Sequence, residues 1–403
     1  MDNTFFQAQK SPERANWSAV FAMTLCVFVL IASEFMPVSL LTPLATDFQV
    51  TEGMAGQGIT ISGFFAVVTS LFISVLTRRL NRKALLLGLT LLMGISGAMI
   101  ALAPNYYLYM VGRALIGVVV GGFWSMSAAI AMRLVPKKQV SKALAIFNSG
   151  NALATVIAAP LGAYLGATIG WRGAFLSLVP IAIITIIWLW ISLPTMPTMP
   201  TGSDNDQDRS QVFNIFSFFK YRIVTLGMLA IGLFFMGQFT LFTYVRPFLE
   251  TVTKIDISMV TFILLLIGIA GFIGTLLINR LLNRGFYRTL IIIPLLMASI
   301  GVSLIFFGHS LFAVIPLLSI WGFIATAAPV GWWSWIPRVF SNNAEAGGGL
   351  MVAVIQVSIA CGASLGGILF DLGGYESAFA ASALLLIVAA ILVQFTAKAE
   401  KGK

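Results

Sequence analysis

Two stretches of the chain, LGAYLGATIGWRGAF at 161–175 and LGGILFDLGGYESAF at 365–379, align without gaps and share six of fifteen residues. Two shorter motifs recur in the same order: RRLNR at 78–82 with RLLNR at 280–284, and GFWS at 122–125 with GWWS at 331–334. The two copies are offset by 204 residues for the long stretch, by 202 for RRLNR and by 209 for GFWS. One match between apolar segments is weak, but three in register predict a chain built from two related halves.

The composition places both halves in a membrane. Hydrophobic residues make up 59% of the 403 and charged residues 9%, and the mean hydropathy is +0.97. A soluble domain needs about a quarter of its residues charged, whereas a helix that crosses the bilayer needs about twenty consecutive apolar residues. Apolar runs of that kind fall at 17–46, 55–77, 83–103, 106–133, 140–168, 173–193, 220–248, 257–280, 288–308, 311–336, 345–371 and 374–397.

These runs predict an all-α polytopic membrane protein with twelve transmembrane helices in two six-helix halves. The N-terminal half is expected at 1–193 and the C-terminal half at 220–403. Between them, 194–219 is rich in proline and aspartate and is predicted to be a cytoplasmic linker. The narrowest separation lies between the third and fourth runs, where only Pro104 and Asn105 mark a turn.

The distribution of basic residues predicts the orientation. With both termini cytoplasmic, twenty of the 24 Lys and Arg residues lie on the inside, and only Arg172, Arg246 and Lys254 lie outside. Such an excess is typical of cytoplasmic loops. It also explains the net charge of +10 by contact with an anionic leaflet, so we expect no nucleic-acid partner.

Few residues are available for catalytic or metal chemistry. The chain has two cysteines, Cys26 and Cys361, in separate apolar runs, and one histidine, His309. This supply predicts no disulfide framework, no metal site and no cofactor. A phosphate-binding loop that ends in Gly-Lys-Ser/Thr is absent from the sequence. An enzyme or a sensor is therefore the distant alternative to a transporter, and an ion gradient is the expected energy source.

Two ionisable residues stand out inside predicted spans, where each costs roughly 2.5–3.5 kcal/mol. The rise of the helix places Glu34 about 15 Å deep in the first span and Arg113 about 10 Å deep in the fourth. We expect Glu34 to bind the coupling proton, with Arg113 tuning it or holding an anionic group. Alternatively, the two form a structural ion pair, or Arg113 organises the helices through backbone carbonyls.

Polar side chains at similar depth in both halves predict a water-filled cavity for a neutral, hydrogen-bonding solute. Interhelical hydrogen bonding is the alternative for each of them. Trp321 is the tryptophan most suited to a pocket, whereas Trp124, Trp332, Trp333 and Trp335 are expected in an aromatic belt at the cytoplasmic interface. The predicted substrate-binding residues are Asn148, Asn151, Gln238, Tyr244, Trp321 and Gln356.

With these residues identified, the whole chain resembles the major facilitator superfamily, in particular its twelve-span drug:proton antiporter and sugar-efflux group. The resemblance rests on EFMPV at 34–38, Gly112-Arg113 with Gly117, APLG at 159–162 and GWRGAF at 170–175. Within that group the chain is most similar to bacterial permeases that export purine ribonucleosides, as seen in NWSAVF at 16–21, GGFWSMS at 121–127, YVRP at 244–247 and PVGW at 329–332.

This resemblance implies a monomeric, proton-coupled antiporter of the bacterial inner membrane that exports a small-molecule substrate, foremost purine nucleosides, by alternating access. A broad drug or sugar exporter of the same fold is the alternative. The resemblance makes Glu34 the proton site and Arg113 the matching arginine. The chain departs from the family pattern at Arg78–Lys83, which has no aspartate, at Ile116, where glutamine is usual, and at Ala159, where glycine is usual.

Overall fold

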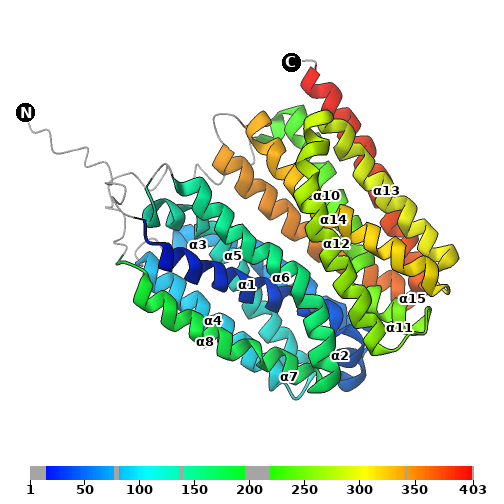
Figure 1. The fold of residues 1–403 in the computed structure, drawn as a ribbon, viewed down its shortest axis with the longest axis horizontal. Coiled ribbons are helices and arrows are strands. Elements are labelled where there is room, and N and C mark those ends of the chain that lie inside the picture. The colour runs from blue at the N-terminus through cyan, green and yellow to red at the C-terminus, as the bar shows by residue number, and fades with distance from the viewer. Residues whose placement is uncertain (1–14, 77–80, 137–138, 196–217, 341–343, 402–403) are drawn as a thin grey trace, which may run out of the picture.

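The computed structural model describes residues 15–76, 81–136, 139–195, 218–340 and 344–401, and all regular elements in these ranges are helical (Figure 1). The elements are α1 (Trp17–Ser39), α2 (Leu41–Phe48), α3 (Glu52–Leu76), α4 (Arg82–Ala101), α5 (Tyr106–Leu134), α6 (Val140–Thr168), α7 (Gly170–Leu176), α8 (Leu178–Ser192), η2 (Phe218–Lys220), α10 (Arg222–Phe242), α11 (Val245–Thr251), α12 (Ile257–Arg284), α13 (Phe286–Phe307), α14 (Leu311–Val339) and α15 (Ala344–Lys401).

The helices account for twelve spans. Ten described stretches are long and apolar enough to cross a membrane, and the last of them, Gly347–Glu400, has 54 residues. Its backbone leaves helical geometry at Gly373 and Gly374, so this stretch forms two spans. The 25-residue helix α3 is the remaining one. The predicted fold class is therefore confirmed.

Polar caps fix where several spans begin. The side chain of Asn105 accepts a hydrogen bond from the backbone N–H of Leu108 at 2.9 Å, so α5 starts directly after the short turn that follows α4. Asn16 and Asn81 cap α1 and α4 in the same way. These caps satisfy N–H groups that have no partner within their own helix, and they confirm the separation of the third and fourth spans.

The repeat is visible in the backbone. Gly170 and Gly374, which are aligned in the two related stretches, have φ angles of +76° and +69°. Residues with a Cβ rarely adopt this conformation. In each half the fifth span thus turns into the sixth through a glycine at the same position of the repeat.

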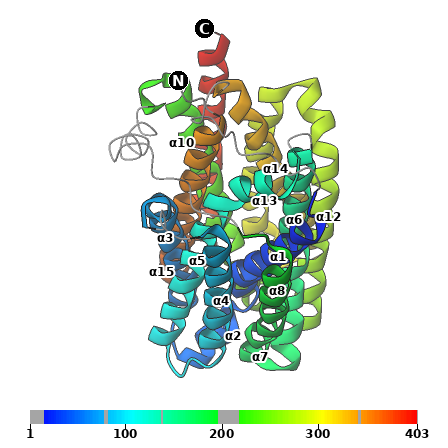
Figure 2. The same ribbon diagram turned by 90° about the vertical axis from the view of Figure 1, so that its left-hand side faces the viewer.

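Three predicted spans are interrupted near the same end of the bundle. The first, sixth and seventh runs are each divided into two helices, α1/α2, α7/α8 and α10/α11. Helix α1 ends at Ser39, two residues after Pro37, which has no N–H to bond the carbonyl of Ser33. We call the end of the molecule that holds α2, α7 and α11 the distal end; the described start of α1 and the end of α15 lie away from it (Figures 1 and 2).

Two hydrophobic cores form, one mainly from α1–α8 and one mainly from α10–α15. They meet where α3 packs against α15 and α6 packs against α12. Most of the predicted linker, 194–219, lies outside the described residues, so the boundaries between the two halves remain a prediction.

The expected aromatic belt is wrong for two tryptophans. Trp332 and Trp335 are 2% and 0% exposed and belong to the core of the C-terminal half. Trp335 packs on Gly227 of α10 and donates its indole N–H to the hydroxyl of Tyr287 at 3.1 Å. The sequence shows that both residues lie toward the end of a span. It does not show that their side chains face a neighbouring helix rather than lipid.

Candidate functional site

Glu34 lies in α1, in the interior of the N-terminal half. The residue is 4% exposed, and its Oε1 atom accepts a hydrogen bond from Nε2 of Gln356 at 3.4 Å. Gln356 belongs to α15, so this contact joins the two halves at the centre of the molecule. A carboxyl group buried in a span is costly unless it has a function or a partner, and here its partner is a neutral amide.

Arg113 is fully buried and binds backbone carbonyls. Its Nε donates to Gly58 O at 3.0 Å, Nη1 to Ser33 O at 2.8 Å and Nη2 to Glu34 O at 3.0 Å. Four residues after Ser33 stands Pro37, which has no N–H to donate to the Ser33 carbonyl. Arg113 supplies the missing donor and thereby ties α5 to both α1 and α3.

The expected contact between Glu34 and Arg113 is made through the backbone of Glu34. The two residues are neighbours, but the guanidinium binds the backbone oxygen of Glu34, and among the described side chains no ion pair joins it to the carboxylate. The contacts of Arg113 match the alternative in which this residue organises the helices through backbone carbonyls. The carboxylate itself remains without a cation on its oxygen atoms.

Three predicted substrate residues bury polar atoms that have no hydrogen-bond partner. These atoms are Oε1 of Gln238 in α10, Nε1 of Trp321 in α14 and Oε1 of Gln356 in α15. An unpaired buried donor or acceptor costs about 1–3 kcal/mol. Two acceptors and one donor in helices of the C-terminal half thus have no partner within the protein.

The other predicted substrate residues have different surroundings. Tyr244 is fully buried at the distal end, where its hydroxyl donates to Ala363 O at 2.8 Å and its ring stacks on Phe370. Asn151 is half-buried in α6, and its backbone carbonyl accepts a bond from Thr155. Asn148 is also in α6, but its side chain lies outside the described part of the structure.

An aromatic contact across the halves was not predicted. The rings of Phe35 and Phe239 stack with centroids 5.7 Å apart and an interplanar angle of 29°. Phe35 directly follows Glu34 and Phe239 directly follows Gln238, so the contact joins the last turns of α1 and α10. Their adjacency to two polar residues within apolar runs was the only signal in the sequence.

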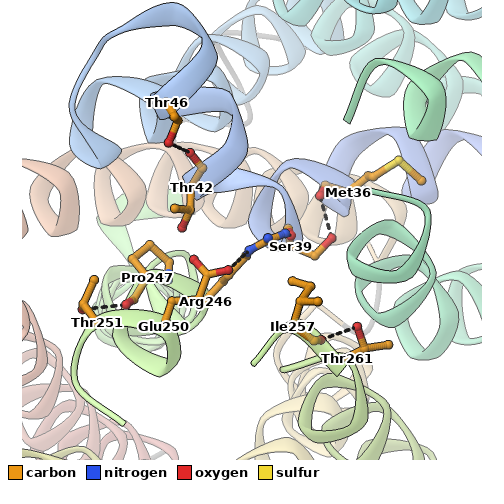
Figure 3. A network of polar contacts seen from close by, with 10 residues as sticks. All are labelled: Met36, Ser39, Thr42, Thr46, Arg246, Pro247, Glu250, Thr251, Ile257 and Thr261. Atoms are coloured by element: carbon orange, nitrogen blue, oxygen red, sulfur yellow. Dashed lines mark hydrogen bonds and ion pairs between the residues drawn. The ribbon is translucent and has the colours of Figure 1, made fainter. Parts of the chain in front are cut away.

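A second unpredicted group of polar contacts lies at the distal end. Arg246 in α11 is 6% exposed, donates through Nη1 to the carbonyl of Ser39 at the end of α1, and bonds Glu250 Oε1 through Nε at 2.8 Å (Figure 3). From sequence, Arg246 was only one of three basic residues on the outside. Because Ser39 belongs to the other half, this group joins the halves around the end of α1.

The described residues contain no group of three or more His, Cys, Asp or Glu that could hold a metal ion. The side chains described above offer hydrogen-bonding groups, aromatic rings and one buried carboxyl group.

The chain is similar to two curated proteins over nearly its whole length. The chain is 60% identical over 394 residues to the transcription regulatory protein OpdE of Pseudomonas aeruginosa, covering 98% of this chain and 97% of that protein. It is 40% identical over 380 residues to the purine ribonucleoside efflux pump NepI of Salmonella typhimurium, covering 94% of each.

Solved structures show the same fold. The D-xylose-proton symporter matches with a TM-score of 0.78 at 17% identity, over 96% of this chain and 99% of that one. An inward-facing bacterial homologue of the lysosomal transporter Spinster matches with a TM-score of 0.70 at 14% identity, over 96% and 97%. The family model of the Major Facilitator Superfamily matches residues 23–352, and the chain belongs to this superfamily of membrane transporters.

Proposed function

We propose that this transporter exports small polar organic solutes, foremost purine nucleosides, in exchange for protons. It would act as a monomer in a bacterial inner membrane, with both chain ends in the cytoplasm and the distal end outside. The observation that carries the proposal is the contact between Glu34 and Gln356, because it places one titratable group where the two halves meet.

Proton coupling requires a group whose charge changes during the cycle. Glu34 is a buried carboxyl group of the N-terminal half. The guanidinium of Arg113 donates to backbone carbonyls rather than to this carboxylate. The amide of Gln356 can serve both states of the acid, since its N–H donates to a carboxylate and its oxygen accepts from a protonated carboxyl. Loss or gain of the proton therefore changes a bond between the halves.

Solute binding is assigned to the C-terminal half. Oε1 of Gln238 is a hydrogen-bond acceptor and Nε1 of Trp321 is a hydrogen-bond donor. Neither atom has a partner within the protein. A purine nucleoside carries donors and acceptors on a flat, neutral ring system, which suits these atoms and the stack of Phe35 on Phe239, the residue that follows Gln238. An apolar drug would leave the amide and indole groups unsatisfied, so the alternative of a broad drug exporter is less favoured. The name of the NepI relative supports the same substrate class.

Transport into everted vesicles or proteoliposomes under an imposed proton gradient tests the proposal. Radiolabelled inosine, adenosine and a sugar would be compared for the wild type, Glu34→Gln and the exposed control Glu376→Gln. We expect gradient-driven accumulation of nucleosides that is lost in Glu34→Gln and kept in Glu376→Gln. Unchanged accumulation in Glu34→Gln would remove this residue from the mechanism. Transport of the sugar without nucleosides would overturn the substrate class.

A regulatory role is the second candidate, because the relative at 60% identity is named a transcription regulatory protein. An exporter can change transcription indirectly if it removes a small inducer from the cytoplasm. Transcript profiles of a deletion strain complemented with wild type or Glu34→Gln separate the two roles. If the variant fails to restore the wild-type profile, the effect follows from transport; if it restores the profile without transport, the chain regulates by another route.

A further inference from the structure

At the distal end, a carboxylate of one half caps a helix of the other. Asp371 in α15 accepts a hydrogen bond from Thr51 Oγ1 at 2.6 Å through Oδ2, and one from the backbone N–H of Gly53 at 3.0 Å through Oδ1. Gly53 lies in the first turn of α3, which begins at Glu52. The first N–H groups of a helix lack internal partners and attract negative charge, so Asp371 completes the start of α3 from the opposite half.

The backbone leaves room for this contact only because of glycine. A Cβ at Gly53 would lie 2.2 Å from Asp371 Oδ2 and 2.6 Å from the carbonyl oxygen of Gly367, and a Cβ at Gly367 would lie 2.9 Å from Gly53 Cα. The two helices therefore touch through their main chains at this point. Any larger side chain at Gly53 would displace the carboxylate.

Further hydrogen bonds follow the same two helices inward. Ser364 Oγ donates to Gln57 Oε1 at 3.0 Å, and Thr60 Oγ1 donates to Ala360 O at 3.1 Å. Successive contacts are three to seven residues apart along each helix, which keeps them on one face. They form a seam, defined here by Thr51, which precedes α3, and by Gly53, Gln57 and Thr60 of α3 with Ala360, Ser364 and Asp371 of α15. Asp371 is its outermost member.

We infer that Asp371 is a gate residue of the distal end: its carboxylate holds α3 against α15, and release of this cap is required before the central site opens on that side. Asp371 is the charged member of the seam and accepts two of its four hydrogen bonds, so we expect its loss to weaken the seam more than the loss of any other member. The inference needs only the relative movement of two halves that a transporter of this superfamily undergoes. It does not depend on which solute or ion is carried.

Distances between spin labels on the two halves test the inference without any transport assay. In a chain with Cys26→Ala and Cys361→Ser, nitroxides would be placed at the exposed distal positions Tyr107→Cys and Phe312→Cys, which are 81% and 92% exposed. A second pair, Ile191→Cys with Arg284→Cys, would report on the opposite end. Pulsed dipolar spectroscopy then gives the populations open at either end.

The matched control is Asp256→Ala. Asp256 is also an exposed carboxylate, and it caps α12 through Ser258 N at 3.3 Å, within a single half. We expect Asp371→Ala to raise the ratio of distal-open to distal-closed molecules about tenfold, the effect of ~1.4 kcal/mol. Asp256→Ala should leave this ratio unchanged. Thr51→Val, which removes one donor to Asp371, should shift it in the same direction by a smaller factor.

Two results would overturn the inference: equal distance distributions in Asp371→Ala and the wild type, or equal shifts in Asp371→Ala and Asp256→Ala. If Asp371→Ala does not fold, Asp371→Asn gives the same test, because its amide keeps one acceptor and loses the charge. Nucleoside uptake by the same variants is a separate readout. Its absence in the wild type would reject the proposed substrate and leave the distance result intact.

Discussion

Corresponding positions in the first spans of the two halves carry different chemistry. Applied to the first spans, the offset of 204 residues between the stretches at 161–175 and 365–379 aligns Glu34 of α1 with Gln238 of α10. Both are followed by a phenylalanine, and those two rings stack on each other. The N-terminal half thus has an acid where the C-terminal half has an amide of similar length.

The fourth spans differ in the same sense. The offset of 209 residues aligns Arg113 of α5 with Gly322 of α14, directly beside Trp321. Arg113 uses its donors on three carbonyls, whereas Trp321 Nε1 has no partner. At these positions the N-terminal half carries an acid and a guanidinium bonded to carbonyls, whereas the C-terminal half carries an amide and an indole with unpaired atoms. The proposed roles, a proton in one half and a solute in the other, follow this difference.

The largest effect is expected from Arg113→Met, which removes the guanidinium bonded to carbonyls in the N-terminal half. Three carbonyls lose their donor, and that of Ser33 has no helical substitute because of Pro37. We expect the free energy of unfolding to fall by at least about 3 kcal/mol, because each of three buried carbonyls left without a donor costs about 1–3 kcal/mol. Thermal unfolding in detergent measures this loss. The control is Arg338→Met, an exposed arginine near the end of α14; similar melting of both variants would contradict the role of Arg113.

The fold itself was largely readable from sequence. Each span contains enough apolar residues to cross the bilayer, and Asn105 marked a helix start even in the shortest turn. The breaks after Ser39 and Phe242 were not foreseen, because the apolar run continues through them and only local backbone bonds show where the helix stops.

The candidate site was less predictable because its contacts depend on how helices rotate against one another. Depth along two spans brought Glu34 and Arg113 together, but depth alone cannot say whether a guanidinium reaches a carboxylate or a carbonyl. The bonds from Gln356 to Glu34 and from Thr51 to Asp371 link residues 322 and 320 positions apart. No local pattern encodes such pairs.

The second prediction concerns variants in which the carboxyl group is removed from α1 or transferred to α10. Glu34→Gln should lose gradient-driven accumulation but retain exchange of labelled for unlabelled solute, because the solute atoms of the C-terminal half are untouched. The double variant Glu34→Gln/Gln238→Glu restores one carboxyl group at the aligned position, and we expect no recovery, since the amide of Gln356 contacts Glu34. Parallel measurement of accumulation and exchange in proteoliposomes distinguishes these outcomes. Recovery in the double variant would mean that the two halves are interchangeable.

The third prediction concerns the free donor of the C-terminal half. Trp321→Phe removes Nε1 and keeps most of the ring, so one hydrogen bond to the solute is lost. We expect the half-saturation concentration for nucleosides to rise up to about tenfold, the effect of 0.5–1.5 kcal/mol, with the response to the proton gradient unchanged. Trp335→Phe is the control, because its Nε1 is already bonded to Tyr287 and its loss should affect stability rather than affinity. An unchanged half-saturation concentration in Trp321→Phe would exclude the indole from the solute site.

The smallest effect is expected from Gln238→Leu, and it concerns selectivity. The unpaired Oε1 atom of Gln238 can only accept a hydrogen bond, so it favours solutes that present an N–H or O–H. Competition between inosine and an analogue methylated at its ring N–H should show a preference for inosine of about two- to tenfold in the wild type. In Gln238→Leu the ratio should approach one, because the leucine side chain cannot distinguish a donor from a methyl group. A preference that survives the substitution would place recognition of the solute on another helix and would weaken the division of roles between the halves.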